Sequence, residues 1–344
     1  MKWDQNSKIK NSVLEAVGYS PLIRLNRLSA DVNADILVKM EFVNPSGSLK
    51  DRVVAAIVEN AEQRGELKPG MILLEGTTGN TGISAAMVGA AKGYRVIIVM
   101  PEGMTEERKK TIRAYGAELV LTPGAETDVD LVLEEVERIK QQYGEQVFQI
   151  GQFVRPDNVL AHYHHTAPEI WEQTEGKVDV FIMCQGTGGT VTGIAKFLKE
   201  KNPHIKVFIS EPEDSPILAR GRIGQHRVQG IADGLIPEIL DLQYVDGIVL
   251  VSSDQAMETA RQLASQEGIF CGPSSGINVA AALKVAGRYP DRKCIVTMLN
   301  DNGLRYLSTE LCGRPVERTL LDREYSLSDE DLKKLAQYKF EVIV

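Results

Sequence analysis

The segment Asn-Pro-Ser-Gly-Ser-Leu-Lys-Asp-Arg at positions 44–52 says most about the fold, because it places a lysine where a helix begins. The Asn-Pro-Ser-Gly cluster is typical of a turn, and Ser48 is a good N-cap residue. Apolar residues then recur at helical spacing as far as Ala61, so we expect a helix that continues to about Arg64. Lys50 therefore lies in the first turn, where unpaired N–H groups and the positive end of the helix dipole disfavour an ammonium group.

A lysine that loses its proton easily is suited to forming a Schiff base. An isolated lysine in a first turn is far more often an ordinary solvated side chain. We interpret Lys50 as functional because two further motifs would complete a site for a cofactor that carries both an aldehyde and a phosphate.

The first of these motifs is the run Gly-Thr-Gly-Gly-Thr at positions 186–190. It follows an apolar run at 178–184 that is typical of a buried strand, and a helical pattern begins at Val191. A glycine loop between strand and helix exposes backbone N–H groups that can bind a phosphate. A dinucleotide fingerprint would need glycine at position 191, and the sequence has no Walker A motif, so a ligand with one phosphate fits better than NAD or ATP. Alone, the loop is equally compatible with a tight turn that binds nothing.

The second motif is Glu-Gly-Thr-Thr-Gly-Asn-Thr-Gly at positions 75–82, which follows the strand-like run at 71–74 and opens another helical pattern. Its hydroxyls, its amide and its flexible backbone could bind a carboxylate or an oxyanion. By itself it is more often an ordinary threonine-capped helix.

Together and in this order, the motifs resemble the cysteine synthase and cystathionine β-synthase family of pyridoxal 5'-phosphate enzymes, and within it the O-acetylserine sulfhydrylases most closely. The resemblance extends over about residues 12–312, and further matching segments lie at 18–25, 152–171, 272–276 and 305–309. It implies an α/β protein of the tryptophan-synthase-β-like fold type II, with two αβα domains built on parallel sheets and the cofactor in the cleft between them.

The same resemblance implies a smaller domain at 44–155, a larger domain made of 12–43 plus 156–312, and a C-terminal extension at 313–344. The chain itself alternates strand-like and helical runs, which favours parallel sheets covered by helices. The strand-like runs are 36–41, 71–75, 95–101, 118–122, 147–152, 178–184, 206–211, 247–252 and 293–299. Helical patterns include 106–115, 129–142, 254–267 and 276–289. In the extension, Ser328 should open a helix, and 340–344 alternates weakly like a strand.

The resemblance also assigns the site residues. Lys50 becomes the catalytic lysine that binds the cofactor covalently. The other implied cofactor-binding residues are Asn80, Gly186, Thr187, Gly188, Gly189, Thr190 and Ser274. The implied substrate-binding residues are Thr77, Thr78, Gly79, Asn80, Thr81, Gln152 and Gly230. No metal site is expected, since the spacing of His162, His164 and His165 does not converge on a metal, and we interpret these histidines as a surface or interface cluster.

A serine at position 274, facing the pyridine nitrogen of the cofactor, would leave that nitrogen largely neutral. This suits β-elimination and β-replacement better than racemisation or transamination. The implied reaction converts O-acetyl-L-serine and sulfide into L-cysteine and acetate through an aminoacrylate intermediate. Cystathionine β-synthase or 2,3-diaminopropionate-type β-replacement, cysteine desulfhydrase and serine/threonine dehydratase remain open. So does a nucleotide-binding module without activity, in which Lys50 would stay unmodified.

Two departures from the family pattern bear on the substrate. Thr78 stands where serine is common, and the segment at 229–234 carries Ala232 and Asp233. Relatives that use O-phosphoserine have an arginine near Gln229, where this sequence is neutral, although Arg227 is close along the chain. We therefore predict that O-acetylserine is a better donor than serine, and that O-phosphoserine is the poorest of the three.

Composition agrees with a globular enzyme of small molecules. The chain has 344 residues, of which 43% are hydrophobic and 25% charged, enough for two core-bearing domains. Its net charge of −8 and the lack of a basic run argue against nucleic-acid binding. No apolar run is long enough to suggest a membrane span, and the first residues do not look like a signal peptide. We expect a cytoplasmic protein that is a homodimer and binds a small amino acid together with sulfide or another small nucleophile.

Overall fold

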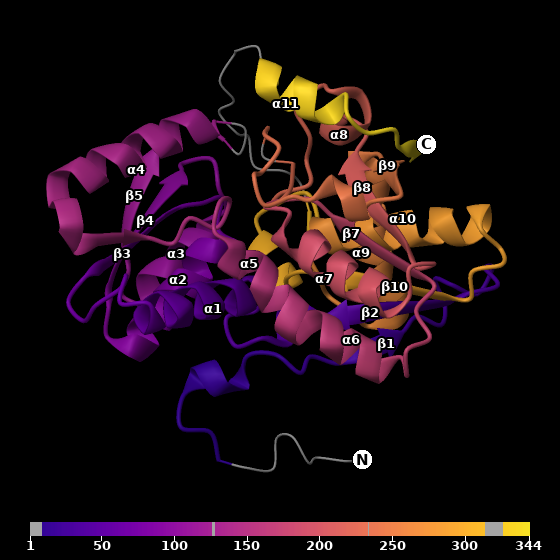
Figure 1. Cartoon of the computed structure of the whole chain (residues 1–344), viewed down its shortest axis with the longest axis horizontal. Helices are drawn as coiled ribbons and strands as arrows, with labels where there is room; N and C mark the ends of the chain where they lie inside the picture. Colours follow the sequence, from indigo (N-terminus) through magenta and orange to yellow (C-terminus); the bar gives the residue numbers. More distant parts are fainter. Residues whose placement is uncertain (1–8, 126–127, 233, 314–325) are drawn as a thin grey trace.

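The computed structural model describes residues 9–125, 128–232, 234–313 and 326–344. Two separate sheets organise these residues, a four-stranded one and a seven-stranded one. In Figure 1 the smaller sheet and its helices lie at the left and the larger sheet at the right. Asp233, which the sequence singled out, lies outside the described residues, as does much of the region that joins the body to the C-terminal segment.

The smaller sheet is wholly parallel and has the order β5-β4-β3-β6. Its strands are β3 (Ile72–Gly76), β4 (Arg95–Pro101), β5 (Glu118–Thr122) and β6 (Val147–Gln149). Four helices cover it: α1 (Lys50–Gln63), α2 (Asn80–Lys92), α3 (Glu106–Ala114) and α4 (Val129–Tyr143). Side chains alternate between the faces, because Leu74 packs with α4 in one cluster while Leu73 joins α1 and α2 in another. Helices thus cover both faces, as the pattern predicted.

The larger sheet has the order β1-β2-β10-β7-β8-β9-β11. Its strands are β1 (Leu22–Arg24), β2 (Asp35–Met40), β7 (Val180–Cys184), β8 (Lys206–Pro212), β9 (Gly247–Val251), β10 (Cys294–Leu299) and β11 (Glu341–Ile343). Its helices are α5 (Pro156–Ala161), α6 (Ala167–Gln173), α7 (Gly189–Lys201), α8 (Ile217–Arg220), α9 (Ser253–Glu267) and α10 (Pro273–Arg288). All strand pairs are parallel except the short edge strand β1, which the sequence analysis did not identify.

The C-terminal segment belongs to this larger sheet. Ser328 caps α11 (Asp329–Leu335) by accepting a hydrogen bond from the Asp331 N–H, as predicted. β11 then pairs in parallel with β9 and becomes the edge of the sheet. Lys334 also donates to the carbonyl oxygen of Pro237, at 3.2 Å. The segment therefore packs on the body of the same chain.

Two of the local expectations that were wrong at their ends concern the surroundings of Lys50 and Glu75. The helix that carries Lys50 has Leu49, not Ser48, at its cap position, although the Ser48 hydroxyl still accepts the Lys50 N–H at 3.3 Å. The strand expected at 147–152 ends at Gln149. It ends early because the buried Glu75 carboxylate accepts the N–H groups of Gly151 and Gln152, which turns the chain away from the sheet.

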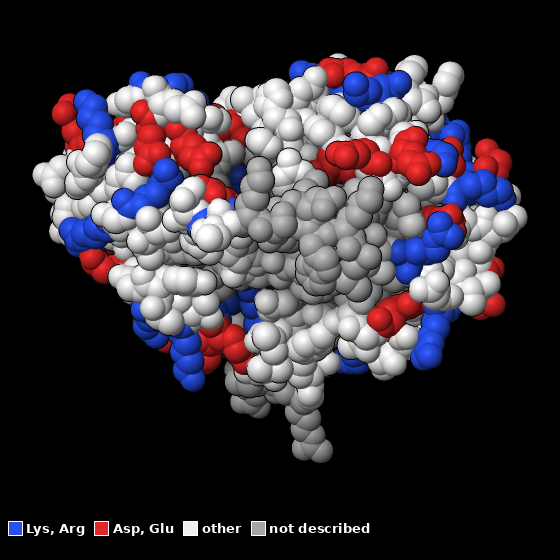
Figure 2. Space-filling view, turned by 90° about the horizontal axis from the view of Figure 1, so that it is seen from below, with Lys and Arg blue, Asp and Glu red and all other residues white. Residues whose placement is uncertain are grey.

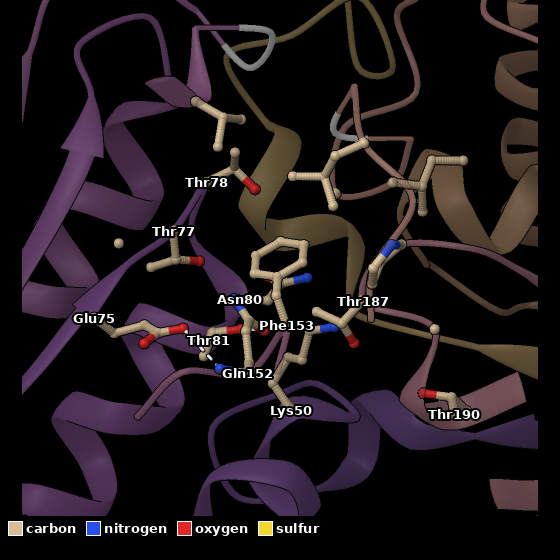
Figure 3. Close-up of a pocket in the computed structure, with 18 of the residues that line it drawn as sticks. Lys50, Glu75, Thr77, Thr78, Asn80, Thr81, Gln152, Phe153, Thr187 and Thr190 are labelled. Carbon is tan, nitrogen blue, oxygen red and sulfur yellow. Dashed lines mark hydrogen bonds between the residues drawn. The ribbon is translucent and has the colours of Figure 1, made fainter. Parts of the chain in front are cut away.

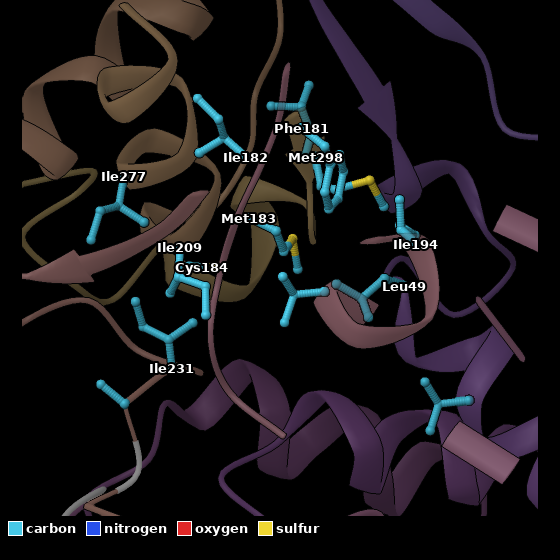
Figure 4. Close-up of a cluster of buried hydrophobic side chains, with 14 of the residues drawn as sticks. Leu49, Phe181, Ile182, Met183, Cys184, Ile194, Ile209, Ile231, Ile277 and Met298 are labelled. Carbon is cyan, nitrogen blue, oxygen red and sulfur yellow. The ribbon is translucent and has the colours of Figure 1, made fainter. Parts of the chain in front are cut away.

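A single cluster of buried apolar side chains includes residues from both sheets. Figure 4 shows the part around β7, where Met183 lies between Cys184 and Leu49, the residue that directly precedes α1. This core fixes the ends of β3, β6 and β7 relative to the first turn of α1. On the face shown in Figure 2, acidic and basic side chains alternate across the surface instead of gathering by sign. Among the described residues, no helix is both long and apolar enough to cross a membrane.

Candidate active site

A cavity of about 350 Å³ opens between the two sheets. Its walls come from the loops that follow β3, β6 and β7 and from the first turns of α1, α2, α7 and α10. In Figure 3, Lys50 lies between the loop that carries Thr77 and Thr78 and the loop that carries Thr187 and Thr190. The fold therefore brings together the three motifs that the sequence analysis connected.

Lys50 is the first residue of α1 and is half-buried in the cavity wall. Its neighbour Asp51 is fully buried and accepts hydrogen bonds from the Ser46 N–H at 2.7 Å and the Ser84 hydroxyl at 2.6 Å. Burial raises the pKa of Asp51, although these donors oppose the shift. The backbone on the C-terminal side of Lys50 is thus held from two directions.

Arg52 belongs to a group of four buried charged side chains, Lys39, Glu41, Arg52 and Glu169, which we call the α1 ionic cluster. Arg52 donates to Glu41 at 2.6 Å and to Glu169 at 2.7 Å, and Lys39 also donates to Glu169 at 2.7 Å. Burial opposes the ionisation of Glu41, but the charge and hydrogen bonds of Arg52 prevail and lower its pKa to about 2. Two cations and two carboxylates therefore compensate one another beneath the first turn of α1.

The glycine loop at 186–190 follows β7 and leads into α7, as predicted. Gly188 has a φ of +82°, a conformation that glycine adopts without strain. Thr187 and Gly188 line the cavity, and their backbone N–H groups have no acceptor among the described residues. Asn158 donates to the Thr187 hydroxyl at 2.9 Å and to the Gln152 carbonyl oxygen at 2.8 Å, which ties the loop to the start of α5.

His162 is hydrogen-bonded to the last residue of the same loop. Its Nε2 lies 3.1 Å from the Thr190 hydroxyl, and its Nδ1 lies 2.9 Å from the Thr166 hydroxyl. A π-helical turn at 162–166 places the ring there, and burial together with the positive charge of Arg52 lowers its pKa to about 3. The expectation that His162 belongs to a surface cluster was therefore wrong: it is fully buried, whereas His164 and His165 are exposed.

The loop after β3 forms the opposite wall, with Thr77, Thr78, Asn80 and Thr81 lining the cavity. Thr81 donates to the Gln152 Oε1 at 2.6 Å, so both predicted carboxylate ligands belong to one hydrogen-bonded unit. The Asn80 amide bridges the two halves of the protein. It donates to Asp301 at 2.7 Å and accepts a hydrogen bond from Arg305.

Ser274 lines the cavity at the first turn of α10, where its hydroxyl accepts a hydrogen bond from Asn300 at 3.1 Å. The cavity thus offers a lysine, a neutral hydroxyl and a loop with unpaired N–H donors. This donor set fits a cofactor that carries an aldehyde, a ring nitrogen and a phosphate. Gly186 and Gly230 also line the cavity, whereas Gly79 and Gly189 lie in the same loops without lining it.

The sequence analysis assigned no role to two residues that line the cavity. Glu75 was quoted within its motif but given no role, and burial raises the pKa of its carboxyl to about 7, although the N–H groups of Gly151 and Gln152 oppose the shift. Arg108 is only 1% exposed, comes from α3 and contacts Gln229. By contrast, Arg227, the cation considered for this position, points outward to Asp254 and to Glu310. A charged residue in the middle of a polar helix gives no signal of its own in one sequence.

Residues 13–301 match a family model described as pyridoxal-phosphate dependent enzyme. The chain is 43% identical over 302 residues to a cysteine synthase of Staphylococcus aureus, which covers 88% of this chain and 96% of that protein. Its structure is similar to that of a cysteine synthase from Entamoeba histolytica, with a TM-score of 0.86, 39% identity and 97% of each chain covered. It is also similar to an O-ureido-L-serine synthase, with a TM-score of 0.84, 40% identity, and 88% of this chain and 95% of that chain covered.

Proposed function

The chain belongs to the family of pyridoxal-phosphate dependent enzymes, and from that premise we propose that it catalyses a β-replacement in which O-acetyl-L-serine and sulfide give L-cysteine and acetate. It is an enzyme of the cysteine synthase type. The observation that carries the proposal is the joint position of Lys50, the glycine loop and Ser274 around one cavity. The 43% identity to a cysteine synthase over most of both chains supports the choice of reaction.

Pyridoxal phosphate, when bound, supplies an electron-withdrawing ring that acidifies the α C–H bond of an amino acid attached to it. In our proposal Lys50 holds the aldehyde carbon, and the N–H groups of Thr187 and Gly188 bind the phosphate. Once the amino acid has displaced it, Lys50 acts as the base that removes the α proton and later returns it. Ser274 would face the ring nitrogen with its hydroxyl, which Asn300 holds by a hydrogen bond.

The substrate carboxylate is assigned to the loop at 77–81 and to Gln152. Thr77 and Thr81 are almost fully buried, as is Gln152, so water has little access to this end of the cavity. The bond from Thr81 to Gln152 orders both side chains before substrate arrives. Such preorganisation favours one orientation of the amino acid, with its α proton toward Lys50.

The likeness to an O-ureido-L-serine synthase supports a second candidate, in which the product is an O-substituted L-serine and the nucleophile is not sulfide. We also propose that the protein is a cytoplasmic homodimer whose smaller domain spans about 44–155 and whose larger domain combines 12–43 with 156–312. Sedimentation of the purified holoenzyme checks the dimer.

A matrix of donors and nucleophiles tests the proposed reaction. The donors are O-acetylserine, serine and O-phosphoserine, and the nucleophiles are sulfide, homocysteine, ammonia and hydroxyurea, with products identified by mass. We expect the highest kcat/KM for O-acetylserine with sulfide, and the lowest with O-phosphoserine as donor. Release of keto acid from donor alone, at the rate seen with nucleophile, would instead identify a dehydratase. A higher kcat/KM with another nucleophile would replace sulfide in the proposal.

A further inference from the structure

Arg108 is a buried cation whose hydrogen-bonding partners are neutral. One of its terminal nitrogens donates to the Gln229 side-chain oxygen and the other to the Tyr306 hydroxyl at 2.8 Å. The guanidinium carbon also lies 4.7 Å from the centre of the Tyr306 ring. No carboxylate of the described residues lies within salt-bridge distance of Arg108. A buried charge in a protein is normally paired with an opposite charge, and Arg108 has no such partner among the described residues.

The charges around Arg108 do not supply the missing partner. Asp301 reaches it only through Tyr306, whose hydroxyl donates to Asp301 at 2.7 Å, and Asp301 also accepts from Asn80. Arg305 is a second cation nearby: burial lowers its pKa, the charge of Asp301 and that of Asp51 oppose the shift, and the charge of Arg108 adds to it. Arg108 itself has no directly bonded carboxylate among the described residues, and an anion in the cavity would supply one.

Two donors at this place have no partner. The Nε of Arg108 and the side-chain nitrogen of Gln229 are both buried and make no hydrogen bond to any described residue. Leaving a buried donor unsatisfied destabilises a protein, so such groups are usually reserved for a ligand or for water. Because the Gln229 oxygen accepts a hydrogen bond from Arg108, the two unpaired donors belong to side chains that are in direct contact.

Arg108 also lies where a substrate would pass. It lines the cavity, and its side chain packs against the loop predicted to bind the substrate carboxylate. A Cβ atom at Gly79 would lie 2.2 Å from the Arg108 Cδ, so only glycine allows this contact. On the other side, Gln229 directly precedes Gly230 and Ile231, which line the cavity as well.

We propose that Arg108 and Gln229 form a subsite for the carboxylate that leaves the donor, so that the enzyme selects serine esters of a carboxylic acid. This inference deepens the proposed function and rests on it. The Cα–H electron pair becomes the Cα–Cβ double bond as the proton passes to Lys50. The Cβ–O bond breaks, its electron pair goes to the leaving oxygen, and the acid departs as a carboxylate. The guanidinium stabilises that charge as it develops.

The same geometry disfavours the other two donors. A guanidinium does not give up its proton at neutral pH, so Arg108 cannot protonate a departing hydroxide as serine requires. The one guanidinium of this subsite compensates a single negative charge, and the phosphate of O-phosphoserine carries about two. A monoanionic carboxylate matches the subsite in both charge and hydrogen-bonding capacity.

The test uses holoenzyme variants Arg108→Met, Arg108→Lys and Gln229→Met, with Arg113→Met as an exposed control on the same helix. Each is assayed with sulfide and with either O-acetylserine or β-chloroalanine, whose leaving chloride has no carboxylate oxygens. We expect Arg108→Met to lower the ratio of kcat/KM for O-acetylserine over β-chloroalanine roughly 10- to 100-fold, the size of a lost charged hydrogen bond. Arg108→Lys and Gln229→Met should show smaller losses, and Arg113→Met none.

Calorimetric titration with sodium acetate supplies a readout independent of turnover. Wild-type holoenzyme should bind acetate at least tenfold more tightly than Arg108→Met. Equal losses with both donors, or unchanged acetate affinity, would overturn the subsite and leave the proposed reaction standing. If wild-type protein converts neither donor with sulfide, the proposed function fails, and the acetate titration of Gln229→Met and Arg108→Lys still decides whether the carboxylate subsite exists.

Discussion

Two buried arginines in this protein lie in contrasting surroundings. Arg52, beneath the first turn of α1, hydrogen-bonds to two carboxylates, and its charge lowers the pKa of Glu41 to about 2. Arg108, in the cavity wall, hydrogen-bonds to a neutral amide and a phenol among the described residues, and its Nε has no hydrogen-bonding partner among them. Both side chains are almost inaccessible to solvent. Burial alone therefore does not tell which charge serves the fold and which serves the reaction.

The hydrogen-bonding partners of the two arginines distinguish them. In the α1 ionic cluster every charge faces an opposite charge, so the cluster holds the Lys50 turn in place and is complete without a ligand. In the cavity wall, the hydrogen-bonding partners of Arg108 among the described residues are neutral, and Glu75, which accepts backbone N–H groups and has its pKa raised to about 7, is its acidic counterpart. A buried charged group that lacks an opposite charge and lies next to a cavity is a candidate for a role in function.

The largest predicted effect comes from removing one charge of the α1 ionic cluster. Arg52→Met leaves Glu41 and Glu169 buried without their main partner, so it should lower the free energy of unfolding by about 3–5 kcal/mol. Arg108→Met removes a charge whose partners are neutral and should cost only about 1–2 kcal/mol. Urea denaturation of both variants measures the difference. Equal losses would show that Arg108 is as structural as Arg52.

A second prediction concerns pH. The pKa of Glu75 is higher in the folded protein, about 7, than its ordinary value of 4.5. The unfolded chain therefore loses this proton first, and Glu75 makes stability fall as pH rises from 4.5 to 7, by up to roughly 3 kcal/mol. Glu75→Gln should flatten this part of the curve.

Glu211 offers a matched control for that experiment, because burial raises its pKa to about 7 as well, while it lies on β8, away from the cavity lining. Glu211→Gln should flatten the stability curve similarly. The variants should separate in the pH profile of kcat/KM, which only Glu75→Gln should alter. Identical pH profiles of kcat/KM in the two variants would show that Glu75 takes no part in the reaction.

The smallest predicted effect concerns His162, a neutral residue beneath the phosphate loop. Its lowered pKa, about 3, keeps the ring uncharged at physiological pH, so it positions Thr190 by hydrogen bonding alone. His162→Asn should weaken cofactor binding about tenfold, as expected for one lost hydrogen bond. Equilibrium dialysis against pyridoxal phosphate measures this, with exposed His164→Asn as the control. Equal affinity in both variants would show that Thr190 is positioned without His162.

The sequence allowed much of this architecture to be predicted, because strands and helices carry periodic signals. β4 and β5 have the predicted bounds, and the parallel sheets with helices on both faces are confirmed. The early end of β6 was missed because it depends on Glu75, which is more than seventy positions away in the chain. The outward direction of Arg227 and the inward direction of Arg108 were equally invisible, since both depend on tertiary contacts between distant segments.

The most direct test of the central claim, that the cavity is a cofactor site built around Lys50, is reduction of the purified holoenzyme with borohydride followed by peptide mass mapping. The pyridoxyl mass should be fixed on Lys50, in stoichiometric yield. Lys50→Ala should take up no covalent label, although the loop at 186–190 should let it retain bound cofactor. Recovery of the label on any other lysine of the wild-type protein would show that Lys50 does not hold the cofactor.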